Sequence, residues 1–147
     1  MTPPTLDVDA CLQKLALLDD LLVDLDRQGS PSGDELRADR DRRHVVERIL
    51  TQLVDISVGL NGLLCRGLGH RRPTGYRDSF TLLADIGVLP ADLVERLGPA
   101  AGMRNLLTHE YGSIDLDVVA AALPIARRDF GEYVAAVRSS LSERRDL

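Results

Sequence analysis

The sequence predicts an all-α protein, a bundle of about four to six helices in a single domain spanning residues 1–147. Three observations favour this fold class. Apolar residues recur at spacings of three and four along most of the chain, which is the period of a helix with one buried face. No segment of useful length alternates apolar and polar residues as a half-buried strand does. Aromatic residues make up only 3% of the chain and tryptophan is absent, so the core must consist of Leu, Val, Ile and Ala, which suits helix packing.

The amino-terminal half predicts two helices. Thr5 can cap a helix that begins at Leu6 and ends at the segment 27–33, where Gly, Ser and Pro interrupt a leucine stripe. A second helix is expected from about Asp34 to Gly67, because its apolar residues form one broad face and its charged residues the opposite one.

The carboxyl-terminal half predicts shorter helices joined by Gly and Pro. A loop at 67–75 precedes a short helix at 76–87. A further short helix is expected at 90–97, with proline in its first turn, and the Gly-Pro pair that follows opens another helix. The last long helix is expected at 115–142, capped by its first residue, an aspartate.

Composition and charge limit the partners that this protein can have. The net charge of −5 argues against non-specific coating of nucleic acid, although it leaves room for a local basic site. All cationic residues except Lys14 are arginines, which bind phosphate through paired hydrogen bonds. Cys11 and Cys65 have no metal-ligand spacing and are expected to be buried, reduced thiols. We find no signal peptide and no apolar stretch long enough to span a membrane, so we expect a cytoplasmic protein without membrane contact.

The segment GMRNLLTHEYGSID, residues 102–115, holds the most reactive side chains of the sequence. Within eight positions it has Arg104, Asn105, Thr108, His109 and Tyr111. On an ideal helix, with about 100° per residue, Arg104 and Tyr111 fall within roughly 20° of each other, and the polar side chains fill one continuous arc. Glu110 would fall on the apolar side, so we expect the helix to end near His109.

These residue types suit chemistry at a phosphate. An arginine can hold a phosphate and stabilise the charge that develops on it, and a histidine can move a proton near neutral pH. The three histidines, His44, His70 and His109, have no spacing typical of a metal site, so such chemistry would be metal-independent. RNA is then the natural substrate, because its own 2′-hydroxyl can serve as the nucleophile. The same spacing also fits a solvated helix end, so it does not decide the function by itself.

The motif RNLLTHEYGSID resembles that of the HEPN domain, in particular of HepT-like toxins, which has Arg, a polar residue, three further residues, His, one residue and Tyr. The resemblance extends to the flanking segments. VERILTQLVDIS, residues 46–57, resembles the long helix that precedes the motif in this family. RPTGYRDSFTLLADIGVL, residues 72–89, resembles the connecting segment. Together they cover about residues 40–120 in the expected order.

The resemblance implies a helical bundle that forms a homodimer, in which two Arg–His motifs share one cleft. It implies a metal-independent ribonuclease without a cofactor, the toxin of a type VII (HEPN/MNT) toxin–antitoxin system. The implied partner is an MNT-type nucleotidyltransferase antitoxin, which neutralises the toxin by transferring AMP to the motif tyrosine. Carried over to this sequence, the catalytic pair is Arg104 and His109, the supporting polar residue is Asn105, and the AMP acceptor is Tyr111. Asp55 matches an acidic position on the preceding helix and is a second supporting residue.

Some residues outside the motif have more than one interpretation. Asp55 lies among apolar residues and needs a partner, which can be Arg104, His109 or Arg48. A group of arginines near His70 either lines a groove for RNA phosphates, meets an acidic partner, or belongs to a solvated loop: Arg66, Arg71, Arg72 and Arg77. Tyr76 and Phe80, four positions apart, are expected in the core, with a platform for base stacking as the alternative, and Tyr133 is expected to pack in the last helix.

Two other function classes stay open at this point. A non-catalytic binding or regulatory subunit of a minimal nucleotidyltransferase would use the same bundle and the same dimer. Because such a subunit needs no proton chemistry, His109→Gln would leave it working. A plain helical interaction module would tolerate changes at every polar residue of the motif.

Overall fold

The computed structural model describes residues 5–109 and 111–145. These residues form six α-helices and one 3₁₀ turn, with no strand among them: α1 (Val8–Arg27), α2 (Gly33–Ala38), α3 (Arg40–Gly67), α4 (Tyr76–Asp85), α5 (Ala91–His109), η1 (Tyr111–Ser113) and α6 (Leu116–Arg145). The prediction of an all-α bundle is therefore confirmed.

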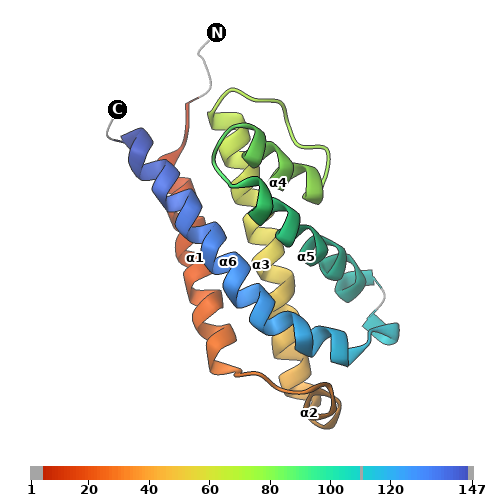
Figure 1. Ribbon diagram of the computed structural model, residues 1–147. Helices are drawn as coiled ribbons and strands as arrows, with labels where there is room; N and C mark the ends of the chain where they lie inside the picture. The colour runs from red at the N-terminus through yellow and green to blue at the C-terminus, as the bar shows by residue number, and fades with distance from the viewer. Residues whose placement is uncertain (1–4, 110, 146–147) are drawn as a thin grey trace.

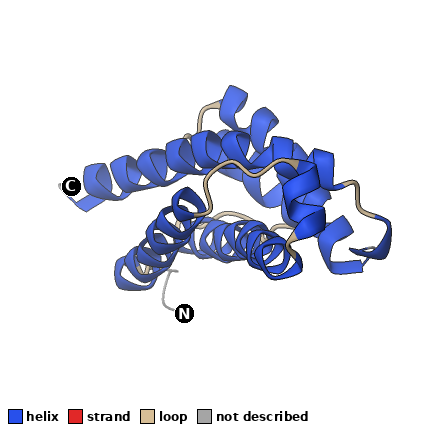
Figure 2. Cartoon of the chain, turned by 90° about the horizontal axis from the view of Figure 1, so that it is seen from below, coloured by secondary structure: helices blue, strands red, loops and turns tan. Residues whose placement is uncertain are grey.

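The long helix α3 lies at the centre of the bundle. It contacts α1 and α6, which lie side by side, and it also contacts α4 and α5. The short helix α2 covers one end of the bundle, where it packs against α3 and α6. Figure 2 shows the same helices from below, with the loops that join them. Because both α4 and α5 pack on α3, residues of three separate helices come together on one side of the molecule.

Two helix boundaries in the amino-terminal half differ from the prediction, both because of aspartate caps. Helix α1 begins at Val8 rather than Leu6, since the side chain of Asp7 accepts from the backbone N–H of Ala10 at 3.0 Å. The helix predicted from Asp34 to Gly67 is two helices. Asp39 has extended backbone angles, and its side chain caps α3 by accepting from a backbone N–H at 3.1 Å, so it ends α2 and starts α3.

The two helices predicted at 90–97 and after 98 are one helix, α5, with Pro99 in its interior. Proline removes one backbone hydrogen bond within a helix. The helix continues because residues on both sides of Pro99 share one buried face, which includes Leu97 and Ala101. Packing against α3 and α6 thus outweighs the local signal. Helix α5 ends at His109, as predicted.

The core contains a cluster of three aromatic side chains, with Tyr133 of α6 in contact with the other two. Its ring meets the edges of Phe80 and Phe130 at centroid distances of 5.8 and 6.4 Å. Its hydroxyl donates to Asn61 Oδ1 at 2.5 Å, with the carbonyl of Ser57 at 3.1 Å. Burial raises the pKa of Tyr133 well above its usual value, so the buried hydroxyl stays protonated. The predictions for Phe80 and Tyr133 are confirmed.

Two further features follow from the position of α3. Among the described residues it is the one helix long and apolar enough to cross a membrane by length and composition, and half of that stretch is buried inside the bundle, as in a core helix. Its Cys65 and the Cys11 of α1 are free and fully buried. Burial raises the pKa of both thiols. The prediction of two buried thiols is confirmed.

Candidate active site

Arg104 of α5 and Asp55 of α3 form an ion pair at the centre of the site. Arg104 Nε lies 2.7 Å from Asp55 Oδ1, and Nη2 donates to Oδ2 at 3.4 Å. The Arg104 side chain is 18% exposed, so its guanidinium borders solvent while the carboxylate fixes it. The hydrogen bond that Arg104 donates to Asp55 raises the pKa of Arg104, which stays cationic at any physiological pH. Of the three partners considered for Asp55, Arg104 is the one that it binds.

Tyr76 of α4 is the third member of this group, and sequence reasoning missed it. Its hydroxyl donates to Asp55 Oδ1 at 3.0 Å, and the Arg104 guanidinium carbon lies 5.0 Å from the centre of its ring. Burial and the contact with Asp55 raise the pKa of Tyr76, so the hydroxyl stays a donor at neutral pH. The prediction that Tyr76 is a core residue holds in part, because the side chain packs against the core but is only partly buried. No spacing in the sequence signals this contact.

A buried chain of hydrogen bonds fixes the position of Tyr76. Asn61 Nδ2 of α3 donates to Ser79 Oγ at 3.0 Å. Ser79 Oγ in turn donates to the carbonyl of Tyr76 at 2.7 Å. Asn61 also accepts from Tyr133, so the first turn of α4 is tied to both α3 and α6 through fully buried polar groups.

Arg104 and Asp55 lie on the wall of a hollow of about 410 Å³ between α3 and α5, which we call the catalytic hollow. Its other residues include His44 and Arg48 of α3 and Thr108 of α5. The sequence analysis did not assign His44 to the site. Among the described residues no group of three or more His, Cys, Asp or Glu side chains is placed to hold a metal ion.

His109 and Asn105 are exposed on α5 and do not line the catalytic hollow. Arg104 and His109 are five positions apart, which places them about 140° apart around the helix axis. Within one copy of the chain, therefore, Arg104 turns inward to Asp55 while His109 faces outward at the end of α5. Tyr111 follows the end of this helix, in η1, so the helical arc that placed it beside Arg104 does not extend to it. The Tyr111 side chain and Glu110 lie outside the described part of the structure.

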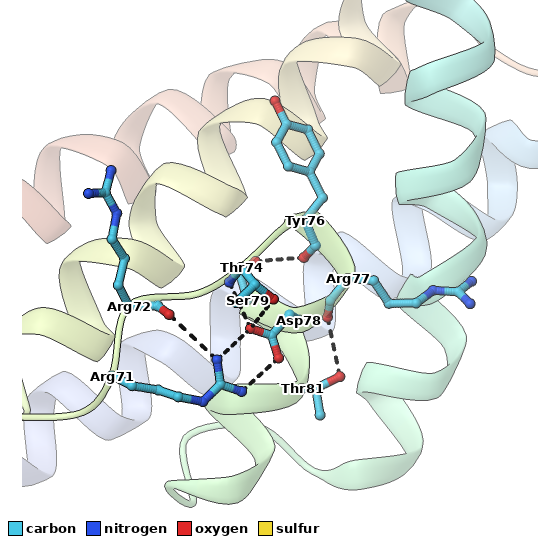
Figure 3. A network of polar contacts seen from close by, with 8 residues as sticks. All are labelled: Arg71, Arg72, Thr74, Tyr76, Arg77, Asp78, Ser79 and Thr81. Atoms are coloured by element: carbon cyan, nitrogen blue, oxygen red, sulfur yellow. Dashed lines mark hydrogen bonds and ion pairs between the residues drawn. The ribbon is translucent and has the colours of Figure 1, made fainter.

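The structure separates the four arginines of the 66–77 region, three of which, Arg71, Arg72 and Arg77, are drawn in Figure 3. Arg71 forms two hydrogen bonds of 2.8 Å with Asp78, which also accepts from the backbone N–H of Thr74 at 2.9 Å. Arg71 and then Thr74 hold the pKa of Asp78 well below its usual range, so this pair holds the loop.

The other three arginines lie on different sides of the loop. Arg66 and Arg72 line a second hollow together with His70. Arg77 points away from Arg72, towards Gly98 of α5 (Figure 3). A single groove lined by all four arginines is therefore not what the structure shows.

Comparison of the chain with known proteins identifies its family. The profile of the family described as "Ribonuclease HepT-like" matches residues 12–137. The chain belongs to this family. One relative is a tRNA nuclease HepT of Aphanizomenon flos-aquae, 25% identical over 128 residues, which cover 87% of each chain. Another is an mRNA nuclease HepT of Shewanella oneidensis, 28% identical over 94 residues, or 64% of this chain and 68% of the relative. The predicted family is confirmed, and with it the enzyme class in the family's description, a ribonuclease.

Solved structures confirm the HEPN-type fold. The tri-AMPylated HEPN toxin of Shewanella oneidensis, in complex with an MNT antitoxin, aligns with a TM-score of 0.81 at 22% identity, covering 89% of this chain and 98% of that one. YutE of Bacillus subtilis, a cytosolic protein of unknown function, aligns with a TM-score of 0.83 at 16% identity, covering 96% and 94%.

Proposed function

We propose that this protein is the ribonuclease toxin of a HEPN/MNT toxin–antitoxin pair and acts in the cytoplasm. The observation that carries the proposal is Arg104, a permanent cation that Asp55 and Tyr76 hold at the edge of a hollow. An exposed histidine, His109, ends the same helix. Membership of the ribonuclease HepT-like family and the two nuclease relatives support the same activity.

The proposed reaction is transesterification within the RNA backbone. The 2′-hydroxyl attacks the adjacent phosphorus, so the O2′–P bond forms while the P–O5′ bond breaks. His109 acts as acid or base, taking the proton from the 2′-hydroxyl or giving one to the leaving O5′. Arg104 stabilises the charge on the pentacoordinate phosphorus, and the exposed amide of Asn105 supports the substrate. The products are a 2′,3′-cyclic phosphate and a free 5′-hydroxyl, and no step uses a metal or a cofactor.

The proposed active form is a homodimer in which two motifs share one cleft. A second copy is needed because one copy turns Arg104 inward and leaves His109 outward. Helices α5 and α6 expose large apolar side chains beside the motif, namely Leu106, Val118 and Ile125. An apolar hollow of about 230 Å³ lies between the same two helices. Exposed apolar surface of this kind is typical of an interface.

The proposed neutralisation is AMP transfer to the hydroxyl of Tyr111 by an MNT-type nucleotidyltransferase antitoxin. Tyr111 lies two positions after His109, directly beyond the end of α5. An AMP group there would add negative charge and bulk next to His109, which opposes binding of RNA. The Shewanella oneidensis toxin of the same fold is tri-AMPylated in its complex with an MNT antitoxin, and this supports the proposal.

The test compares wild type, Arg104→Ala and His109→Ala in a growth assay and in RNA cleavage by the purified proteins. We expect each substitution to lower cleavage by about a hundredfold or more and to relieve growth arrest, since each removes a group that acts on the transition state. Wild-type cleavage should persist in excess EDTA. Arg144→Ala, an exposed arginine in the last turns of α6, is the control and should behave as wild type.

The same experiment separates the proposal from a non-catalytic subunit of a nucleotidyltransferase. A His109→Gln protein that keeps its full effect on growth would refute the ribonuclease site and favour the binding subunit. Intact mass of the protein co-expressed with an MNT-type nucleotidyltransferase tests the modification. An unchanged mass, or AMP-sized steps that persist in Tyr111→Phe, would refute Tyr111 as the acceptor.

A further inference from the structure

The second hollow, of about 910 Å³, lies between α3 and the loop that leads into α4. We call it the basic hollow. Its floor is the face of α3 that carries Val58 and Gly62, and its wall is the loop segment 72–75. The volume is at the upper end of the range for small-molecule pockets, so the space exceeds what one small anion needs.

Positive charge gathers at this hollow although the protein is acidic overall, with a net charge of −5. Arg66, His70 and Arg72 line it, and no carboxylate lines it among the described residues. With the residues that the structure describes, neither Arg66 nor Arg72 forms an ion pair, whereas Arg71 pairs with Asp78. The only lysine, Lys14 of α1, reaches its edge, with Nζ 3.3 Å from the point that a Cβ would occupy at Gly59. Unpaired cations around a concave surface attract polyanions.

The floor of the basic hollow is open and largely apolar. A Cβ at Gly62 would meet no atom within 4 Å, so the glycine leaves the helix surface bare. Val58 and Leu63 flank this surface, and Tyr76 also lines the hollow. Flat apolar surface beside unpaired cations suits a nucleotide, whose base needs an apolar face and whose phosphate needs a cation.

The basic hollow lies on the same face of α3 as the catalytic hollow. His44, Arg48 and Asp55 line the catalytic hollow, and Gly62 and Arg66 line the basic hollow. Together with Thr51 and Val58 these positions follow at intervals of three or four, which keeps them on the same side of a helix. Arg66 lies about 16 Å from Asp55 along the helix axis. Tyr76 belongs to both regions, since it lines the basic hollow and donates to Asp55.

We propose that the basic hollow is a second RNA subsite, which binds nucleotides next to the scissile phosphate through Arg66, Arg72 and the floor of α3. This inference rests on the proposed ribonuclease function and deepens it. An RNA occupant is favoured over an acidic protein segment because the hollow shares a face of α3 with the site of Arg104 and offers a bare floor for bases. Arg71 then serves the loop through Asp78, and Arg77 lies outside the subsite.

The test measures RNA binding in a His109→Ala background, with a short fluorescein-labelled single-stranded RNA of mixed sequence and fluorescence anisotropy at several salt concentrations. For the added pair Arg66→Gln and Arg72→Gln we expect about tenfold or greater loss of affinity at low salt. The slope of log affinity against log salt should become shallower by about 1.4, since each phosphate contact on a single strand contributes about 0.7. The added Arg77→Gln, which removes one charge outside the hollow, should leave both quantities unchanged.

A second variant tests the floor without changing charge. Gly62→Leu puts a side chain into open space, so the fold should persist, as circular dichroism can verify. We expect weaker RNA binding with an unchanged salt slope. Unaltered affinity in both Gly62→Leu and the double arginine variant would overturn the subsite. It would equally be overturned if the double variant kept its RNA affinity but no longer co-purified with the nucleotidyltransferase, which would assign the hollow to a protein partner.

Failure of this inference is distinguishable from failure of the proposed function. If the chain with native His109 cleaves RNA, and the double arginine variant cleaves it equally fast at low RNA concentration, the subsite is wrong while the ribonuclease stands. If wild type neither cleaves nor binds RNA, the proposed function itself is wrong.

Discussion

At the scale of single residues, the carboxylate of Asp55 determines where the Arg104 guanidinium lies. It accepts from Arg104 and from Tyr76, which come from two different helices. A guanidinium held by a carboxylate on one side and an aromatic ring on another keeps one orientation, so little order is lost when a phosphate binds. Tyr76 thus acts through Arg104 as a positioning residue.

Tyr76→Phe tests this role, because phenylalanine keeps the ring near Arg104 and removes only the hydrogen bond to Asp55. We expect kcat for RNA cleavage to fall about three- to tenfold, equivalent to about 1 kcal/mol for a hydrogen bond to a charged group in a partly exposed position. KM should change little, since the ring still lines the basic hollow. An unchanged kcat, or an effect confined to KM, would show that the hydroxyl does not position Arg104. Steady-state kinetics and the melting temperature are the measurements.

At the scale of elements, the loop before α4 is held by one ion pair, Arg71–Asp78. The first helical turns carry Tyr76 into the site, so the loop and the site are coupled through the chain itself. Gly75, at the cap position of α4, has no side chain to accept from the helix N–H groups. Asp78 instead ties the loop by accepting from Arg71 and from the backbone of Thr74.

Asp78→Asn is expected to lower the melting temperature near neutral pH, with a dependence on pH that follows from the lowered pKa of Asp78. A carboxyl whose pKa is lower in the folded protein stabilises the fold above its unfolded value, about 3.9, and this contribution is lost as the pH falls below it. The difference in melting temperature between wild type and variant should therefore be constant from pH 6 to pH 8, roughly, and shrink below about pH 4. A constant difference at all pH values would refute the role of this ionised pair. Thermal melts across a pH series provide the measurement.

At the scale of the whole molecule, the side formed by α5 and α6 combines the motif with exposed apolar residues. Val118 and Ile125 of α6 are 54% and 49% exposed. Arg104 faces inward on this side of the bundle and His109 faces outward. Both features have the same explanation if a second copy covers this surface and completes the site.

Val118→Glu combined with Ile125→Glu should convert a dimer to a monomer in light scattering and remove RNA cleavage, because charge would be buried at the interface. Leu17→Glu, which changes an equally exposed leucine on α1, is the control and should leave the dimer intact. Mixing inactive Arg104→Ala and His109→Ala proteins should restore about a quarter of the activity if subunits exchange at random and each of the two Arg–His pairs in the shared cleft joins residues of two copies, because half of the dimers are mixed and keep one pair of the two. A monomeric wild type, or no recovery on mixing despite exchange, would contradict the shared cleft.

Much of this architecture could be predicted from the sequence because it depends on neighbours along the chain. The three- and four-residue spacing of apolar residues determined that the protein is helical. The arc of polar residues around Arg104 predicted that α5 ends at His109, where the next position would turn to the apolar side. The spacing of Arg104, His109 and Tyr111, with its flanking segments, was enough to indicate the family.

Other features were decided only by tertiary packing. Tyr76 and Asp55 are 21 positions apart, and Arg104 and Asp55 are 49 apart, so no local pattern signals that they meet. Pro99 is a local stop signal, yet α5 continues through it because its buried face packs across the proline. Four arginines of one segment looked alike in sequence, and only the fold separated Arg71 in its ion pair from Arg66 and Arg72, which form no ion pair with any residue that the structure describes. The physical reason is the same in each case: helix formation is a property of neighbouring residues, whereas a site forms where separate helices pack.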